Sequence, residues 1–173
     1  GTGIVDAVAA MLSLEVLEPT GLMKMGSHPS VDARGLSLDR ARGIVLEAAD
    51  VATVQKAKAA IAATMKTLLA ELGIGEQDLQ RVFLSGAFGS RLHPGRASAI
   101  GLLPAVDPAR FVLAGNTARV GASMILLSEK VREAGEDLAR KVRHLSVAED
   151  SRFETFFLDS LYFPRPSIRK QAE

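Results

Sequence analysis

The stretch that decides the fold is Val82-Phe83-Leu84-Ser85-Gly86-Ala87-Phe88-Gly89. Its first residues are apolar enough to form a buried strand, and a helix is expected soon after the glycines. The two glycines leave the backbone bare, so a flat ring or a phosphate could approach the main-chain N–H groups without meeting a Cβ atom. They could equally do no more than form a tight turn, because a lone Gly-x-x-Gly pattern is weak. Taken alone, this stretch leaves both interpretations open.

A second strand with the same kind of ending follows one cycle later. Phe111-Val112-Leu113-Ala114 runs into Gly115-Asn116, and Thr117 opens another helix. Ligands of α/β proteins gather at such strand ends, so two neighbouring glycine turns favour a shared cleft. Gly121 and Ala122 lie inside the following helix, where glycine costs about 1 kcal/mol relative to alanine. We therefore expect these two residues to pack closely against another helix.

The order of the remaining elements predicts an α/β fold with a short, mainly parallel sheet covered by helices. Glycines and prolines are spread through 17–42, which should be mostly loop. Residues 165–173 should form a flexible tail. The other expected elements are helices at 3–14, 51–72, 94–102 and 151–161, and strands at 43–46, 81–85, 110–114 and 144–147.

Two of these helices have apolar residues at helical spacing. In the first helix they are Ile4, Val8, Met11 and Leu12. The long helix should begin at Asp50 as its N-cap and end at Gly73. Its buried stripe should consist of Val54, Ile61, Met65, Leu68 and Leu72. Both helices should therefore lie on a core.

The composition excludes several classes of function. With 47% apolar residues and a net charge of +1, the 173-residue chain gives no reason to expect nucleic acid as a partner. No apolar run approaches the roughly 18 residues that cross a bilayer. The chain has no cysteine, and its three histidines, His28, His93 and His144, are scattered, which argues against a metal site. A Walker phosphate loop and a hydrolase nucleophile motif are also absent, so no catalytic residue is expected.

Gln55 and Lys58 are the remaining candidates. They are three residues apart on the long helix and so share a face. Exposed lysines are common on helices, and these two residues could simply form a solvated rim.

In order along the chain, these segments resemble the second lobe of the acetate kinase/sugar kinase/Hsp70/actin superfamily, an RNase H-like fold. Within it, the segments are most similar to the C-terminal region of reductive activators of corrinoid proteins. The similarity covers most of residues 1–130, and the ending Leu161-Tyr162-Phe163-Pro164 resembles the family as well. The segments that carry it are Gly1-Thr2-Gly3-Ile4-Val5-Asp6, Gln55-Lys56-Ala57-Lys58, Val82 to Gly89, Ile100-Gly101-Leu102-Leu103-Pro104 and Gly115-Asn116-Thr117-Ala118.

The resemblance assigns roles to individual residues. It implies that Gln55 and Lys58 contact the ribose of ATP, and that Gly115 and Asn116 belong to the cleft or to a connection between lobes. The resemblance also implies that the turn formed by Ser85, Gly86, Ala87, Phe88 and Gly89 holds the adenine.

The resemblance also implies a longer parent protein, in which residues 1–164 form a single C-terminal ATP-binding lobe. The two phosphate loops that hold ATP with Mg²⁺, and a [2Fe-2S] domain, would precede Gly1. Such a cytoplasmic parent would use ATP to return an inactive Co(II) corrinoid protein of a methyltransferase system to Co(I), and it could be a homodimer. This chain alone should not hydrolyse ATP. The alternatives are a non-catalytic dimerisation or docking module, and a lobe of a sugar or acyl kinase.

Overall fold

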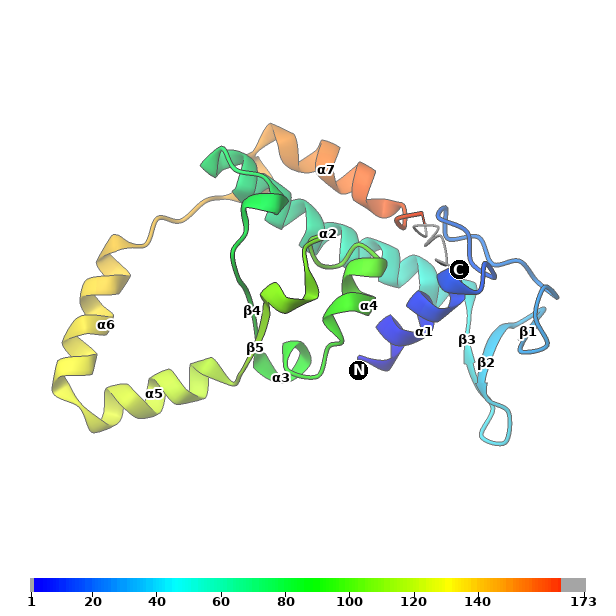
Figure 1. Ribbon diagram of the computed structural model, residues 1–173, viewed down its shortest axis with the longest axis horizontal. Coiled ribbons are helices and arrows are strands. Elements are labelled where there is room, and N and C mark those ends of the chain that lie inside the picture. The colour runs from blue at the N-terminus through cyan, green and yellow to red at the C-terminus, as the bar shows by residue number, and fades with distance from the viewer. Residues whose placement is uncertain (1, 166–173) are drawn as a thin grey trace, which may run out of the picture.

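The structure is a computed structural model that describes residues 2–165 (Figure 1). The expected tail therefore lies almost entirely outside the described residues. Fifteen elements follow one another within these described residues. They are α1 (Gly3–Ser13), β1 (Val31–Asp32), β2 (Gly35–Asp39), β3 (Ile44–Leu46), α2 (Ala48–Leu72), η1 (Glu76–Asp78), β4 (Val82–Ser85), α3 (Gly86–Gly89), α4 (Pro94–Ala99), η2 (Pro108–Arg110), β5 (Phe111–Gly115), α5 (Thr117–Leu127), α6 (Glu129–Lys141), η3 (Val147–Glu149) and α7 (Ser151–Leu161).

The core forms around α1, as its apolar stripe predicts. Val8, Met11 and Leu12 are buried, and Ile4 packs against them as a partly buried residue. Helix α4 lies against α1 and adds the buried Ile100 at its end. The same cluster includes Leu84 of β4, so the core holds the strand that leads into the glycine turn.

The long helix α2 starts earlier than expected. Its N-cap is Glu47 and not Asp50, which lies three residues further on. The Glu47 backbone N–H donates to Oδ2 of Asp50 at 2.9 Å, so Asp50 supports the first turn from inside the helix, as in a capping box. The end is as expected, because Gly73 takes a left-handed φ of 68° at the C-cap.

The predicted buried stripe of α2 is wrong for three of its five residues. Ile61, Leu68 and Leu72 are exposed, whereas Val54 packs against the core as a partly buried residue and Met65 is partly buried. The buried face consists instead of Val51, Lys58, Ala59, Ala62, Ala63 and Thr67. Helix α7 lies along α2 (Figure 1), and small alanine side chains on the buried face let the two helices approach closely. The position of the partner helix, and not the size of the apolar residues, decides which face is covered.

The strands form two sheets. As predicted, β4 and β5 are parallel, with Phe83 paired to Val112 and Leu84 to Leu113. The α/β class is therefore confirmed, although β3 joins β1 and β2 in a separate antiparallel sheet. Residues 17–42 contain two of these strands, β1 and β2, and are not only loop. Glycines in this segment form the turns that connect short strands. At Gly35, for example, a Cβ atom would lie 2.2 Å from the Leu46 carbonyl oxygen of β3.

Two expectations for the later part of the chain are wrong. The segment 144–147 is not a strand: it lies in the connection between α6 and α7, and its last residue, Val147, begins η3. Gly121 does not serve close helix packing, because a Cβ atom there would meet nothing within 4 Å. Helices α5 and α6 pack on each other and project away from the other elements (Figure 1). Within residues 2–165, no helix is both long and apolar enough to cross a membrane.

Candidate functional site

Two glycine turns lie side by side at the carboxyl ends of β4 and β5. The strand register shifts after Leu84, so that Ser85 pairs with Gly115. This pairing brings Ser85–Gly89 next to Gly115-Asn116, and α3 contacts β5 directly. We call these two segments the glycine edge. The structure thus brings together all the predicted site residues except Gln55 and Lys58.

The backbone of the glycine edge is open at two positions. Gly86 and Gly115 have φ angles of +82° and +68°, which side chains with a Cβ atom rarely adopt. A Cβ atom built at either position would meet no atom within 4 Å, so the space beside both glycines is free of protein. Both residues could therefore let a flat ligand approach the main chain.

Other members of the glycine edge have structural tasks. A Cβ atom at Gly89 would lie 3.3 Å from the Leu84 carbonyl carbon, so this glycine lets α3 pack on the end of its own strand. Asn116 caps α5, because its Oδ1 accepts the Arg119 backbone N–H at 3.0 Å. The Ser90 N–H donates to the Gly86 oxygen at 3.0 Å and closes the turn. Phe88 is half exposed beside it.

Lys58 is not on a solvated rim. Its side chain is only 2% exposed, and its Nζ donates to the backbone oxygens of Ser160 at 2.5 Å and Tyr162 at 2.6 Å. The ammonium also lies 4.9 Å from the centre of the Phe163 ring. The last carbonyl groups of a helix have no partner within the helix and form the negative end of its dipole. Lys58 therefore satisfies the end of α7 with a positive charge.

Gln55 and Lys66 extend this contact along α2. Nε2 of Gln55 donates to the oxygens of Thr20 and Leu161, both at 3.1 Å. Nζ of Lys66 donates to the Ser160 hydroxyl at 3.0 Å. We call Gln55, Lys58 and Lys66 with residues 160–163 the C-terminal clamp. In this conformation two of the three hydrogens of the Lys58 ammonium go to carbonyl groups of the clamp. Lys58 also lines a cavity of about 220 Å³ together with Lys66 and Gly101.

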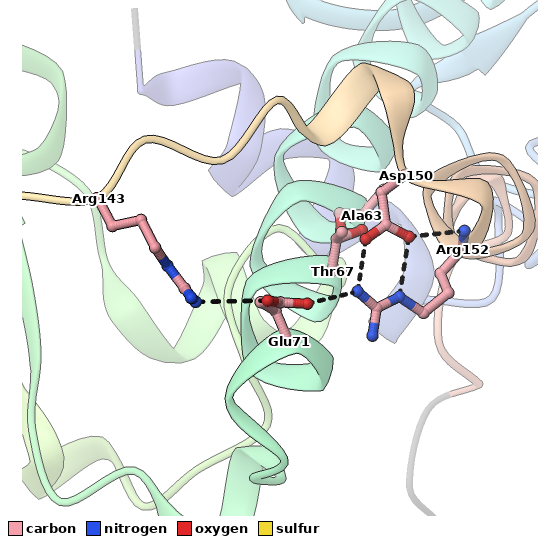
Figure 2. A network of polar contacts seen from close by, with 6 residues as sticks. All are labelled: Ala63, Thr67, Glu71, Arg143, Asp150 and Arg152. Atoms are coloured by element: carbon pink, nitrogen blue, oxygen red, sulfur yellow. Dashed lines mark hydrogen bonds and ion pairs between the residues drawn. The ribbon is translucent and has the colours of Figure 1, made fainter.

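The other end of the α2–α7 contact is held by an ionic network (Figure 2). The Glu71 carboxylate accepts from Arg152 at 3.0 Å and from Arg143 at 3.3 Å. Arg152 also donates through Nε to Asp150 at 2.8 Å, and the Asp150 side chain caps α7 by accepting the Arg152 backbone N–H. The Arg152 guanidinium holds the pKa of Asp150 at about 2. Helix α7 is thus fixed to α2 at both of its ends.

Comparison with known proteins identifies the group to which this chain belongs. Residues 1–172 match the family described as the C-terminal domain of RACo, the ASKHA domain.

The chain belongs to this ASKHA-domain family.

The relatives that match this chain are longer proteins. The chain is 29% identical, over 94% of its own length, to the corrinoid activation enzyme RamQ of Eubacterium limosum, and it covers 30% of that protein. It is 28% identical over 94% of its length to the [Co(II) methylated amine-specific corrinoid protein] reductase of Methanosarcina barkeri, of which it covers 28%. A solved reductive activator for a corrinoid, iron-sulfur protein is similar at a TM-score of 0.80 and 27% identity, over 94% of this chain and 28% of that one. The chain thus spans less than a third of each relative.

Sequence reasoning missed several residues of this ASKHA domain. Glu71 and Arg152 lie 81 positions apart, and nothing in their local pattern indicates that they meet. Asp150 could have been found, because it directly precedes a helix and is a favoured N-cap type. Phe163 lies in a segment that resembles the family, but its role as a buried anchor depends on contacts that only the fold provides.

A cavity of about 930 Å³ opens beside the C-terminal clamp of this ASKHA domain. Its walls come from residues 12–24 and 162–165, with Leu17, Pro19 and Phe163 among them. It therefore adjoins the clamp, and none of its lining residues belongs to the glycine edge. Among residues 2–165, no three histidine or acidic side chains lie close enough together to hold a metal ion.

The clamp predicts a pH dependence of stability. Burial, with a smaller contribution from the nearby charge of Lys66, lowers the pKa of Lys58 from 10.5 to about 8. Between these two values the unfolded chain holds a proton that the folded chain has released, so stability rises with pH. We expect the free energy of unfolding to increase from about pH 8 to about pH 10 relative to that of Lys58→Met. Urea unfolding at a series of pH values measures this, and a constant difference would contradict it.

Proposed function

We propose that this chain is the nucleotide-binding lobe of an ATP-dependent activator, which returns an inactive Co(II) corrinoid protein to Co(I). The observation that carries the proposal is the pair of open glycine turns at neighbouring ends of parallel strands. Such strand ends are where α/β folds bind nucleotides. Two relatives are named as a corrinoid activation enzyme and a corrinoid protein reductase. These names support a corrinoid protein as the target of the proposed activator.

In this proposal the adenine lies against the glycine edge, beside Gly86, Ala87 and Gly89, while Gly115 and Asn116 border the cleft. The phosphates with Mg²⁺ and a [2Fe-2S] cluster, which supplies the electron, belong to other parts of a longer cytoplasmic parent. Nucleotide binding then shifts the equilibrium between open and closed lobes by its higher affinity for the closed state. The residues of this chain contribute binding and orientation, and none is proposed as catalytic.

The proposed ribose contact has a consequence for the C-terminal clamp. Gln55 and Lys58 each donate two hydrogen bonds to backbone oxygens, at Thr20, Ser160, Leu161 and Tyr162. A ribose that takes these donors must displace at least some of the carbonyl groups. Binding of ATP would then loosen residues 160–163, which faster hydrogen exchange of their amides in the presence of ATP would reveal.

The test of the adenine contact uses three matched substitutions in the full-length protein. Gly86→Ala places a methyl group in the open space where we expect the ring, and Gly115→Ala places one in the open space at the border of the same cleft. We expect each to weaken the binding of ATP with Mg²⁺ about tenfold or more, measured by calorimetry, because close approach to the backbone is lost.

Gly43→Ala is the control for this test. Gly43 also has a positive φ, +65°, with nothing within 4 Å, but it lies in the turn between β2 and β3. It therefore carries the same backbone strain without touching the glycine edge, and ATP affinity should stay unchanged. Equal affinities in all three variants would refute the adenine contact. If the unsubstituted protein does not bind ATP, the docking module of the same fold is the better assignment.

A further inference from the structure

Two lysines of α2 converge on one residue near the end of α7. Lys58 and Lys66 lie eight residues apart, which is about 12 Å along the helix axis. Their side chains close this gap, because Nζ of Lys58 donates to the backbone oxygen of Ser160 at 2.5 Å and Nζ of Lys66 donates to the Ser160 hydroxyl at 3.0 Å. Lys58 and Ser160 are only 2% and 5% exposed. Two positive charges, which repel each other, are therefore held at a largely buried position.

Neither of these charges has a carboxylate partner within the described chain. The ion pairs of residues 2–165 all involve arginine, so neither Lys58 nor Lys66 takes part in one. Backbone oxygens and the Phe163 ring supply only partial negative charge to Lys58. Buried charges are ordinarily paired with an opposite charge, because an unpaired one loses its hydration without compensation. The surroundings of Ser160 thus have an excess of positive charge.

A cavity of about 220 Å³ opens beside the two lysines, and its lining includes Lys58, Lys66, Gly101 and Ser160. Gly101 has a φ of +74°, and a Cβ atom there would lie 3.6 Å from Nζ of Lys58, so this glycine keeps the space beside the ammonium free. A water molecule takes about 30 Å³ in the liquid, so the cavity has room for an ion of a few heavy atoms. Among the described residues of the lining, the exposed Asp159 is the one acidic side chain against two lysines.

The polar groups of this lining have unused donors. An ammonium group has three hydrogens to donate and a hydroxyl has one. Lys58 uses two hydrogens for the Ser160 and Tyr162 oxygens, and Lys66 uses one for the Ser160 hydroxyl. Within residues 2–165, one hydrogen of Lys58, two of Lys66 and the hydroxyl hydrogen of Ser160 have no acceptor. A ligand suited to this cavity therefore carries negative charge and several acceptor atoms.

We propose that this cavity binds a phosphate group, held by Lys58, Lys66 and Ser160. The tetrahedral oxygens of a phosphate can accept hydrogens that arrive from three side chains in different directions, and hydrogen bonds between ionised groups are the strong ones. A bound anion also opposes the burial and the Lys66 charge that lower the pKa of Lys58. The ligand is inorganic phosphate or a phosphate group of a nucleotide. None of the residues that line the cavity belongs to the glycine edge, so the site is separate from the proposed adenine contact.

Calorimetry of the full-length protein with inorganic phosphate tests this site, at neutral pH and with chloride keeping the ionic strength constant. We expect Lys66→Met to weaken the binding of phosphate about tenfold or more, because contacts from a charged donor are lost. Lys56→Met removes an exposed lysine of the same helix that does not line the cavity, and the affinity should stay unchanged. No saturable binding of phosphate by the unsubstituted protein, or equal affinities in the two variants, would overturn the proposal.

ATP with Mg²⁺ as a second ligand distinguishes the two sources of the phosphate group. If free phosphate competes with ATP and Lys66→Met weakens the binding of both, the site holds a phosphate group of the nucleotide. If free phosphate leaves ATP binding unchanged and Lys66→Met weakens only phosphate binding, inorganic phosphate is the ligand. Gly86→Ala tests the glycine edge separately, so the failure of one proposal does not decide the other.

A measurement on the unsubstituted protein does not depend on the folding of a variant. N-hydroxysuccinimidyl acetate acetylates accessible lysines, and mass spectrometry gives the rate at each position. We expect phosphate to slow the acetylation of Lys66 in proportion to the occupancy of the site and to leave that of Lys56 unchanged. Equal slowing at both lysines, or none at Lys66, would refute the phosphate site.

Discussion

Replacement of Lys58 by methionine is expected to lower the free energy of unfolding by about 3 kcal/mol. Methionine keeps most of the apolar stem but removes the ammonium that donates to the Ser160 and Tyr162 oxygens. Hydrogen bonds from a charged donor contribute about 1.5–3 kcal/mol each, and a buried carbonyl group left without a donor adds a desolvation cost. Relief from burying a positive charge offsets part of this loss. Urea unfolding followed by circular dichroism measures the difference.

Lys56→Met is the matched control. Lys56 lies two residues earlier on α2, and its side chain is exposed. Its loss should change the free energy of unfolding by less than about 0.5 kcal/mol. If both variants unfold at the same urea concentration, Lys58 does not anchor α7. Hydrogen exchange of the last turn of α7 should quicken in Lys58→Met before the rest of the protein is affected, because the clamp acts locally.

The parts of the fold that follow local rules could be predicted from the sequence. The strands at Val82 and Phe111 are short apolar runs, each ended by a glycine, and the left-handed conformation of Gly73 follows from its place after a helix. The stripe of α1 needs only helical spacing. The adjacency of the two glycine turns also follows, since neighbouring parallel strands end at the same edge.

The contacts that hold α7 could not be predicted in this way. Lys58 lies 102 positions from Ser160, and lysine is almost never fully buried, so a solvated position was the natural expectation. The alanines of α2 carry little hydrophobic signal, yet they form its buried face because α7 approaches closely. The missing information was the identity of the partner helix, which no periodicity within α2 contains.

The clamp and the proposed ribose contact give Gln55 and Lys58 two competing roles. In this structure they support the end of α7, whereas the family resemblance implies that they contact ribose. The two roles differ in their measurable effects, because loss of support for α7 lowers stability with and without nucleotide, while loss of a ribose contact lowers only the affinity for ATP. Lys58→Met therefore needs both measurements before its effect on nucleotide binding is interpreted.

The substitution Phe163→Ala is expected to destabilise the protein by about 3–4 kcal/mol. Phe163 is 2% exposed, belongs to the core cluster and donates its backbone N–H to the Pro19 oxygen at 2.8 Å. Truncation removes the large apolar surface that joins the end of the chain to the loop after α1, and it leaves a cavity. Urea unfolding gives the size of the loss. Tyr162→Ala is the control, because this neighbouring aromatic side chain is mostly exposed and its truncation keeps the carbonyl group that accepts from Lys58.

The double variant with Lys58→Met separates the ring from the rest of the clamp. The Lys58 ammonium lies 4.9 Å from the centre of the Phe163 ring, a geometry that contributes about 0.5–2 kcal/mol when it is desolvated. The losses in free energy of unfolding caused by Lys58→Met and by Phe163→Ala should therefore not be additive. The double variant should be more stable, by about that amount, than the sum of the two losses predicts. Strict additivity would show that the ammonium acts only through the carbonyl groups. Equal losses for Phe163→Ala and Tyr162→Ala would contradict the role of Phe163 as the anchor of the C-terminal segment.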